Sequence, residues 1–239
     1  MINGIKQASA GLDSYASVQE VIARNIANVN TVGFKKNTVS FHTTLAQTAG
    51  TKTNSLQTDY GVDHSQGNLT YTGNPLDIAI EGDGFFALET DEGLRYTRNG
   101  QFQLSGIGEI VTATGSKLLG QGGPVIIPDD GERIVIDKTG VVTVDGKEID
   151  RLMVIHFADL NALVPSGDST FTAPLNSVNM DGDAKFNVSQ GYLESSNVNV
   201  VMEMVNMIAN MRNYEASNNI IKSLSGLMER LINNQSNAV

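Results

Sequence analysis

The sequence predicts an α+β protein, with long N- and C-terminal helices paired as a coiled-coil-like domain and a central all-β domain of short antiparallel strands. Two observations support this class. Apolar residues recur with helical spacing near the two ends of the chain, whereas the middle alternates apolar and polar residues as strands do. Because no helical pattern separates the central strands, parallel βαβ units are excluded and antiparallel pairing is expected.

Residues 1–34 are expected to form the N-terminal helix of the helical domain. Apolar residues repeat in a heptad pattern with one polar exception, Gln19, and this pattern is typical of a seam that packs against another helix. Two interleaved series carry the pattern: Ile5, Leu12, Gln19 and Ile26, and Ala8, Tyr15, Ile22 and Val29. Gly33 follows the last periodic residue and is expected to end the helix in the left-handed conformation.

Residues 190–239 are expected to form the C-terminal helix, beginning near Asn197 or Asn199, with Glu203 favourably placed against the helix dipole. The apolar face is wider than one heptad seam, so one partner helix could not cover it. Its candidate contact residues, with those of the first helix, are Ile5, Leu12, Ile22, Ile26, Val205, Ile208, Ile221, Leu224, Met228 and Leu231. Two interpretations stay open: a terminal helix packed on its own domain, or a helix buried among several neighbours in an assembly.

Between the helices, residues 35–66 are expected to be a polar arm or linker and residues 67–189 the central β domain. Short apolar runs recur at roughly ten-residue spacing across the β domain. Asn99-Gly100 and Asp145-Gly146 are the dipeptides favoured in tight hairpin turns, so a hairpin is expected at each.

The composition narrows the possible partners and compartments. The formal net charge of −10 argues against binding nucleic acid, and the chain has no apolar run long enough for direct membrane insertion. The first residues lack the basic, apolar and small-residue order of a cleaved signal peptide. The absence of cysteine excludes disulfides and thiolate chemistry.

No residue pattern predicts catalysis, a cofactor or a metal site. The three histidines, His42, His64 and His156, are far apart, and no pair has metal-ligand spacing on one helix. Asp181-Gly182-Asp183 resembles a fragment of a calcium loop but lacks the further ligands, so a tight acidic turn is expected instead. The glycine-rich stretches are not followed by helices and do not match phosphate-binding fingerprints.

Several motifs, in order along the whole chain, resemble those of the bacterial flagellar rod and hook proteins. They are Asn25-Ile26-Ala27-Asn28 with Thr31-Val32-Gly33-Phe34-Lys35; Gln66-Gly67-Asn68-Leu69 with Asn74-Pro75-Leu76-Asp77; Tyr96-Thr97-Arg98-Asn99-Gly100; and Gln190-Gly191-Tyr192-Leu193-Glu194-Ser195-Ser196-Asn197-Val198-Asn199. The resemblance implies that the chain is not an enzyme but a structural subunit of the flagellar basal-body rod. The short chain, the lack of a long insertion and Gly120-Gln121-Gly122-Gly123-Pro124 make it most similar to the proximal-rod member.

The resemblance also implies partners and a location. The partners would be copies of the chain itself, other rod proteins of the proximal and distal rod, and the flagellar type III export apparatus. The location would be the periplasm-spanning rod, reached without a cleaved signal peptide. The residues expected to act in assembly are Asn25, Ala27, Asn28, Thr31, Gly33, Phe34, Gly191, Tyr192, Ser196, Asn197, Val198 and Asn199. Asn25, Asn28, Gly33 and Phe34 are expected to act in assembly and not in folding of the β domain.

Two alternatives remain at this stage. The chain could be a distal-rod or hook subunit of the same family, which the identity of its crosslinked neighbours would distinguish. It could also be a glycan-binding or enzymatic β domain with helical dimerisation ends, although the low aromatic content of 6% argues against this.

Overall fold

The computed structural model describes residues 2–48, 51–128, 131, 133–174, 178–179 and 186–236. The chain divides into two compact units. The first, here called the helical unit, contains Met1–Ala27, Asn37–Asp63 and Asn199–Val239. The second, the β unit, contains Asn28–Lys36 and His64–Val198. The chain therefore contributes both of its ends to one unit, and the α+β class is confirmed.

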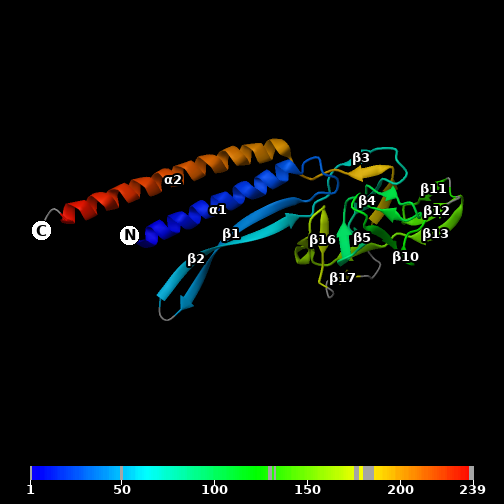
Figure 1. The fold of residues 1–239 in the computed structure, drawn as a ribbon, viewed down its shortest axis with the longest axis horizontal. Helices are drawn as coiled ribbons and strands as arrows, with labels where there is room; N and C mark the ends of the chain where they lie inside the picture. The colour runs from blue at the N-terminus through cyan, green and yellow to red at the C-terminus, as the bar shows by residue number, and fades with distance from the viewer. Residues whose placement is uncertain are drawn as a thin grey trace. The chain divides into compact units, whose positions relative to one another are not determined.

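The helical unit contains α1 (Ile2–Ala27) and α2 (Val200–Ser236), which contact each other and run in opposite directions (Figure 1). At 1.5 Å per residue, the 26 residues of α1 extend about 39 Å and the 37 residues of α2 about 55 Å. Asn199 caps α2 as expected, because its side-chain oxygen accepts a hydrogen bond from the backbone N–H of Met202 at 3.1 Å.

The expected end of the first helix at Gly33 is wrong, because α1 ends at Ala27. Turns follow, in which the N–H of Thr31 bonds to the carbonyl of Asn28 and the N–H of Phe34 to that of Thr31. Gly33 does have the expected positive φ, +67°, but its N–H bonds to the carbonyl of Glu194, in the β unit. A hydrogen bond to a residue distant in sequence, and not a helical one, therefore holds Gly33.

The polar segment after the first helix contains β1 (Lys36–Thr48) and β2 (Thr51–Asp63), which form a two-stranded sheet. Sequence reasoning expected an arm here but missed the strand pairing. The segment lacks alternating apolar residues, which are the usual signal of a strand with one buried face.

The β unit contains the remaining strands, all with antiparallel pairing in the registers described. Their bounds are β3 Leu69–Tyr71, β4 Ile78–Gly82, β5 Phe85–Thr90, β6 Gly93–Thr97, β7 Gln103–Leu104, β8 Ile110–Val111, β9 Lys117–Gly120, β10 Gly123–Pro124, β11 Ile134–Ile136, β12 Val141–Val144, β13 Lys147–Arg151, β14 Val154–Phe157, β15 Val164–Pro165, β16 Thr170–Thr172, β17 Val178–Asn179, β18 Phe186–Gln190 and β19 Tyr192–Glu194, with a 3₁₀ turn at Leu160–Ala162.

The largest sheet has the order β15-β16-β6-β5-β9-β8-β7, with β10 beside β9 and with β14 pairing both β5 and β17. Smaller sheets are β11-β12-β13, β18-β4 and β19-β3. One apolar core joins the largest sheet to its neighbours, because the core contains side chains of β4, β5, β9, β12 and β18. These buried members include Ile80, Phe86, Leu118, Val142 and Val188.

One of the two expected hairpins forms. Asp145 and Gly146, with φ values of 50° and 82°, connect β12 to β13, so this prediction is confirmed. The hairpin expected at Asn99-Gly100 is wrong, because β6 pairs with β5 and β16, whereas β7 pairs with β8. Gly100 instead lies so close to the carbonyl of Ile78 that a Cβ would collide with it, and this close approach explains the glycine.

Candidate assembly site

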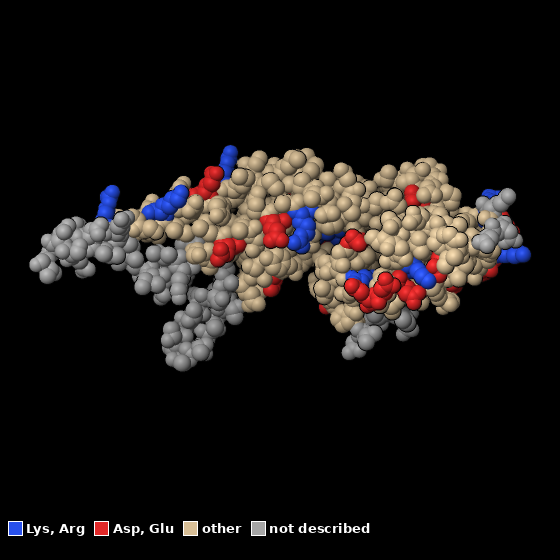
Figure 2. All heavy atoms as spheres, in the orientation of Figure 1, with Lys and Arg blue, Asp and Glu red and all other residues tan. Residues whose placement is uncertain are grey.

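α2 exposes large apolar side chains along most of its described length. Ile208 keeps 55% of its surface accessible, and the other exposed large apolar side chains of this helix are Val201, Met202, Met204, Val205, Met211, Tyr214, Ile220, Leu224 and Leu227. In Figure 2 the charged side chains of the helical unit stand singly or in small groups, separated by uncharged surface. Extended exposed apolar patches are uncommon on monomeric soluble proteins and mark interaction surfaces.

The candidate helix-face residues fall into two groups. Val205, Ile208 and Leu224 are exposed on α2, and Ile221 is half-buried. On α1, Ile22 is buried, and Leu12 and Ile26 are half-buried. Ile5, Met228 and Leu231 lie on the helices, but their side chains are outside the described part. The α1 residues therefore contribute mainly to contacts within the chain, whereas the α2 residues are available to another molecule.

A groove of about 560 Å³ runs between the two helices. Its lining is Tyr15, Ala16, Gln19, Glu20 and Ala23 of α1 and Asn210, Met211, Tyr214 and Glu215 of α2. Asn210 is buried in this seam and donates hydrogen bonds of 2.9 Å to the carbonyl of Tyr15 and to the side-chain oxygen of Gln19. Gln19, the polar exception in the heptad pattern, therefore has a polar partner on the facing helix.

A second polar contact lies near the other end of the seam. The side-chain nitrogen of Asn25 donates to the carbonyl of Asn37 at 2.9 Å and to Glu203 at 3.4 Å. The side-chain oxygen of Asn25 accepts from the N–H of Asn37 at 2.8 Å. Asn25 and Glu203 are both buried, so this expected assembly residue satisfies its hydrogen bonds within its own chain.

In the β unit, the segments that resemble the rod and hook proteins meet at the carboxylate of Glu194. Glu194 is 1% exposed and accepts hydrogen bonds from the ammonium of Lys35 at 2.6 Å, the guanidinium of Arg98 at 3.3 Å and the N–H of Gly67 at 2.9 Å. Four segments distant in sequence are thus held by one side chain. We call Lys35, Arg98 and Glu194 the buried charge cluster.

The buried charge cluster contains two cations and one anion, so its burial removes a net positive charge from water. Burial lowers the pKa of Arg98 from its ordinary value, while the charge and hydrogen bond of Glu194 oppose this shift. Arg98 also donates to the carbonyl of Gly82 at 2.7 Å and lies over the ring of Phe85, 5.1 Å from its centroid. These contacts offset the loss of water around the guanidinium.

Two glycines allow the backbone to approach the buried charge cluster. A Cβ on Gly33 would collide with the backbone of Asn99, and a Cβ on Gly67 would collide with the carbonyl of Ser195. The expectation that Gly33 takes no part in folding of the β domain stays a prediction, and its close packing and its hydrogen bond to Glu194, both within the β unit, argue against it.

Most of the other expected assembly residues lie near residues 28–36 or near residues 196–199, where the chain passes between the two units. Thr31 donates its hydroxyl hydrogen to Asn28 at 3.1 Å, and Asn197 accepts from the N–H of Lys36 at 2.7 Å. Ser196 accepts from the N–H of Val198, which is buried. The remaining placements are Ala27, exposed at the end of α1; Phe34, half-buried; Gly191, with a φ of +79°; Tyr192, 5.1 Å from Tyr71 between ring centroids; and Asn199, at the N-terminus of α2.

The sequence patterns did not identify the residues that organise the buried charge cluster and the seam between α1 and α2. Lys35, Arg98 and Glu194 stand inside the quoted motifs but were not singled out, and Asn210 was not recognised as the partner of Gln19. The signal that could have indicated these residues is the presence of charged residues in motifs that also contain glycines. A long charged side chain beside a tightly packed backbone is buried only when it has a partner of opposite charge.

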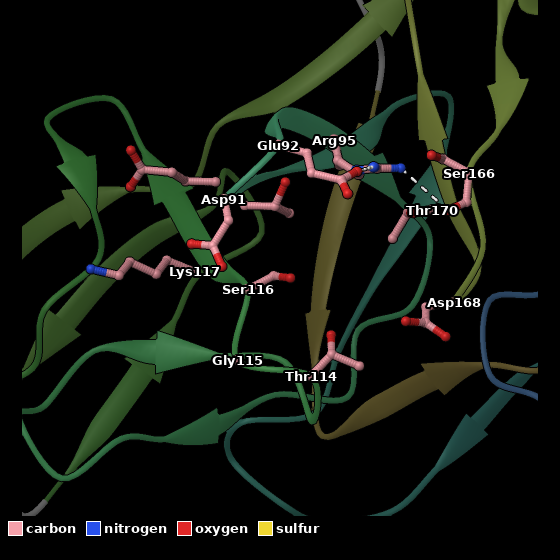
Figure 3. Close-up of a pocket in the computed structure, with 12 residues that line it drawn as sticks. Asp91, Glu92, Arg95, Thr114, Gly115, Ser116, Lys117, Ser166, Asp168 and Thr170 are labelled. Carbon is pink, nitrogen blue, oxygen red and sulfur yellow. Dashed lines mark hydrogen bonds and ion pairs between the residues drawn. The ribbon is translucent and has the colours of Figure 1, made fainter.

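The β unit also carries a polar surface cleft of about 610 Å³, shown in Figure 3. Asp91 and Asp168 lie on opposite sides of it, and Arg95 pairs with Glu92 and donates to the carbonyl of Ser166. Within the part of the chain that the structure describes, no group of three or more His, Cys, Asp or Glu residues could hold a metal ion. The residues that line the cleft include no cysteine or histidine.

Three known protein families match the two ends and the middle of the chain. The family described as "Flagella basal body rod protein" matches residues 7–35, "Flagellar hook protein FlgE/F/G D1 domain" matches residues 79–144, and "Flagellar basal body rod FlgEFG protein C-terminal" matches residues 189–234. Together with helices at both ends and a β unit between them, these matches define an axial structural protein of the flagellum.

Individual relatives give the same result over nearly the whole chain. The chain is 34% identical to the flagellar basal-body rod protein FlgG of Bacillus subtilis, an alignment that covers 98% of this chain and 99% of that protein. It is 34% identical to FlgG of Agrobacterium fabrum, covering 90% and 92%, and 33% identical to FlgF of Caulobacter vibrioides, covering 82% and 83%. The chain belongs to the flagellar basal-body rod protein family.

Proposed function

We propose that this rod subunit polymerises through its terminal helices, with the outer face of α2 buried against helices of other copies and of other rod proteins. The observation that carries the proposal is the set of exposed large apolar side chains of α2, among them Ile208 and Leu224. Burying such a face stabilises an assembly by roughly 25 cal/mol for each Å² of apolar surface. A helix already paired with α1 on one side can give its other side to neighbours.

The pairing of α1 with α2 is proposed to be coiled-coil-like. The heptad pattern of α1 supports this geometry, as does the burial of Val21 and Ile22 beside the polar contacts of Asn25 and Asn210. Each subunit would contribute one pair of helices. When the contact between successive subunits does not close into a ring, its repetition builds a helical filament. Such an arrangement suits a shaft that transmits torque.

The assembly motif is proposed to hold two of the places where the chain passes between the units in the conformation that the polymer needs. Asn28, Thr31, Gly33 and Phe34 lie at one of these places, and Ser196, Asn197, Val198 and Asn199 at the other. The support is the set of hydrogen bonds that fix each place, among them that between the N–H of Lys36 and Asn197. Ala27, Gly191 and Tyr192 belong to the same proposed motif.

The role is structural and not enzymatic, and the location is the flagellar basal body. The proximal rod is the proposed position, on the basis of the short chain without a long insertion. Passage through the flagellar type III export apparatus, without cleavage of a signal peptide, would bring the subunit to the periplasm-spanning part of the rod. Among the described residues, no helix has the length and apolar character required to cross a membrane.

Relatives named FlgG and FlgF match at similar identity, so the identities do not separate the positions within the rod. A distal-rod position is therefore the alternative. Site-specific crosslinking in cells, followed by identification of the neighbouring subunits, distinguishes the two positions. Crosslinks to hook-proximal neighbours only would contradict the proximal position.

Replacing Ile208 by Asp tests the proposed surface. An unpaired charge buried at each subunit contact would cost several kcal/mol per subunit, so rod growth and motility should be lost while the protein is still made and soluble. Asn213→Asp, at an exposed and already polar position of the same helix, is the matched control and should retain motility. Normal rods in the Ile208→Asp strain would show that the outer face of α2 does not contact other subunits.

A further inference from the structure

The apolar faces of the two helices carry little information about register, because apolar contacts are not directional. Two polar contacts interrupt the seam. Near one end, Asn25 bonds to Glu203, and further along, Gln19 bonds to Asn210. On α1 these positions are six residues apart and on α2 seven, so the contacts lie about one heptad apart along antiparallel helices.

We propose that the Gln19–Asn210 and Asn25–Glu203 contacts are the specificity-determining contacts that fix the register in which α1 pairs with α2 of the same chain. Asn210 and Glu203 of α2 are buried, so each favours a register that offers it a hydrogen-bonding partner. Polar groups buried between helices select one register at the expense of some stability, because other registers leave them without partners.

A slide of one heptad in either direction breaks this matching. In one direction Asn210 comes to lie beside Leu12, an apolar seam residue with no side-chain hydrogen bond to offer. In the other direction Glu203 passes beyond Ala27, where α1 ends, and loses the side chain of Asn25. The observed register therefore satisfies both contacts, and neither neighbouring register does.

This selection has a consequence for assembly that rests on the proposed function. In a polymer, α1 would be surrounded by several copies of α2 with the same apolar residues. The two polar contacts would favour pairing of α1 with α2 of the same chain, in one register, over pairing with the apolar surface of α2 from a neighbouring subunit. The register itself is a property of the single chain and can be measured whether or not the polymer forms.

Spin labels on the full-length chain can measure the register. The chain contains no cysteine, so Glu20→Cys and Lys222→Cys, both at exposed positions, place labels only at these two sites. In the observed register the labelled positions are offset by about 20 Å along the helix axes, and a slide of one heptad changes that offset by about 10 Å. Double electron–electron resonance on soluble protein, diluted with unlabelled chain, resolves such a change.

The decisive variant replaces the partners of both polar contacts by leucine, Gln19→Leu with Asn210→Leu and Asn25→Leu with Glu203→Leu, which should keep the helices paired. We expect the labelled wild type to show one distance and this variant to show a second population shifted by about 10 Å. Gln19→Asn with Asn210→Gln exchanges the two amides and should restore the single distance. Asn213→Leu, which adds an apolar residue at an exposed position of α2, is the matched control and should also show one distance.

Three results would overturn the proposal. The first is a single unshifted distance in the four-leucine variant. The second is the same shifted population in the amide-exchanged variant, which would show that packing and not polarity decides the register. The third is loss of the helical circular dichroism signal in the four-leucine variant, since apolar replacement is expected to preserve pairing.

Discussion

Replacing Glu194 by Gln tests how strongly the buried charge cluster supports the β unit. The substitution keeps the shape of the side chain but removes the carboxylate that pairs with both Lys35 and Arg98, whose side chains are nearly inaccessible to water. Breaking a buried ion pair by removing one partner costs about 3–5 kcal/mol, because the other charge stays buried without compensation. With two cations sharing one anion, we expect a loss in that range, a large part of a typical total of about 5–15 kcal/mol.

Urea unfolding of the full-length chain, followed by circular dichroism and tyrosine fluorescence, measures the loss. Glu92→Gln is the control, because Glu92 also pairs with an arginine of the β unit but is 77% exposed. Exposed ion pairs contribute about 0–1 kcal/mol, so this variant should unfold close to wild type. Equal and small effects of the two substitutions would refute the reasoning, since burial would then not decide the contribution of the pair.

Gly33→Ala should destabilise the β unit by at least about 1–2 kcal/mol, because its φ is positive and the new Cβ would collide with the backbone of Asn99. Gly11→Ala in α1, where a Cβ meets nothing, should instead stabilise by about 0.5–1 kcal/mol, and similar urea midpoints for both would contradict the argument. Burial raises the pKa of Tyr96 in the folded protein. The neutral Tyr96 side chain therefore contributes its full stabilisation below about pH 10, the ordinary tyrosine pKa, and this contribution is lost as the pH rises through the higher pKa of the folded state. The wild-type urea midpoint should therefore fall more steeply above about pH 10 than that of Tyr96→Phe, and parallel curves would be the contrary result.

The broad fold could be predicted from local patterns. The heptad repeat around Leu12 and Ile22 predicts a helix that packs against another, and the turn signal at Asp145-Gly146 predicts the hairpin between β12 and β13. Each of these patterns is a property of neighbouring residues and does not depend on the rest of the chain. The end of α1 at Ala27 could not be predicted in this way, because Gly33, the expected end, is held by a hydrogen bond to Glu194, which is distant in sequence.

The buried charge cluster could not be predicted because its members are far apart in sequence. Lys35 and Glu194 are separated by 159 residues, and Arg98 and Glu194 by 96. A single sequence shows that these residues are charged but not which opposite charge each meets. The same limit applies to Asn210 and Gln19, which are 191 residues apart. The heptad pattern identified Gln19 as an exception, and only the facing helix explains it.

The N-terminal motif of the rod and hook proteins has two separate structural roles in this chain. Asn25 satisfies its hydrogen bonds in the helical unit, with Asn37 and Glu203. Gly33 and Lys35, only a few residues later, satisfy theirs in the β unit through Glu194. Because the motif contributes to both units, a substitution at its start should disturb helix pairing and one at its end the β unit. Loss of motility alone therefore does not identify an assembly residue, and stability must be measured for each unit.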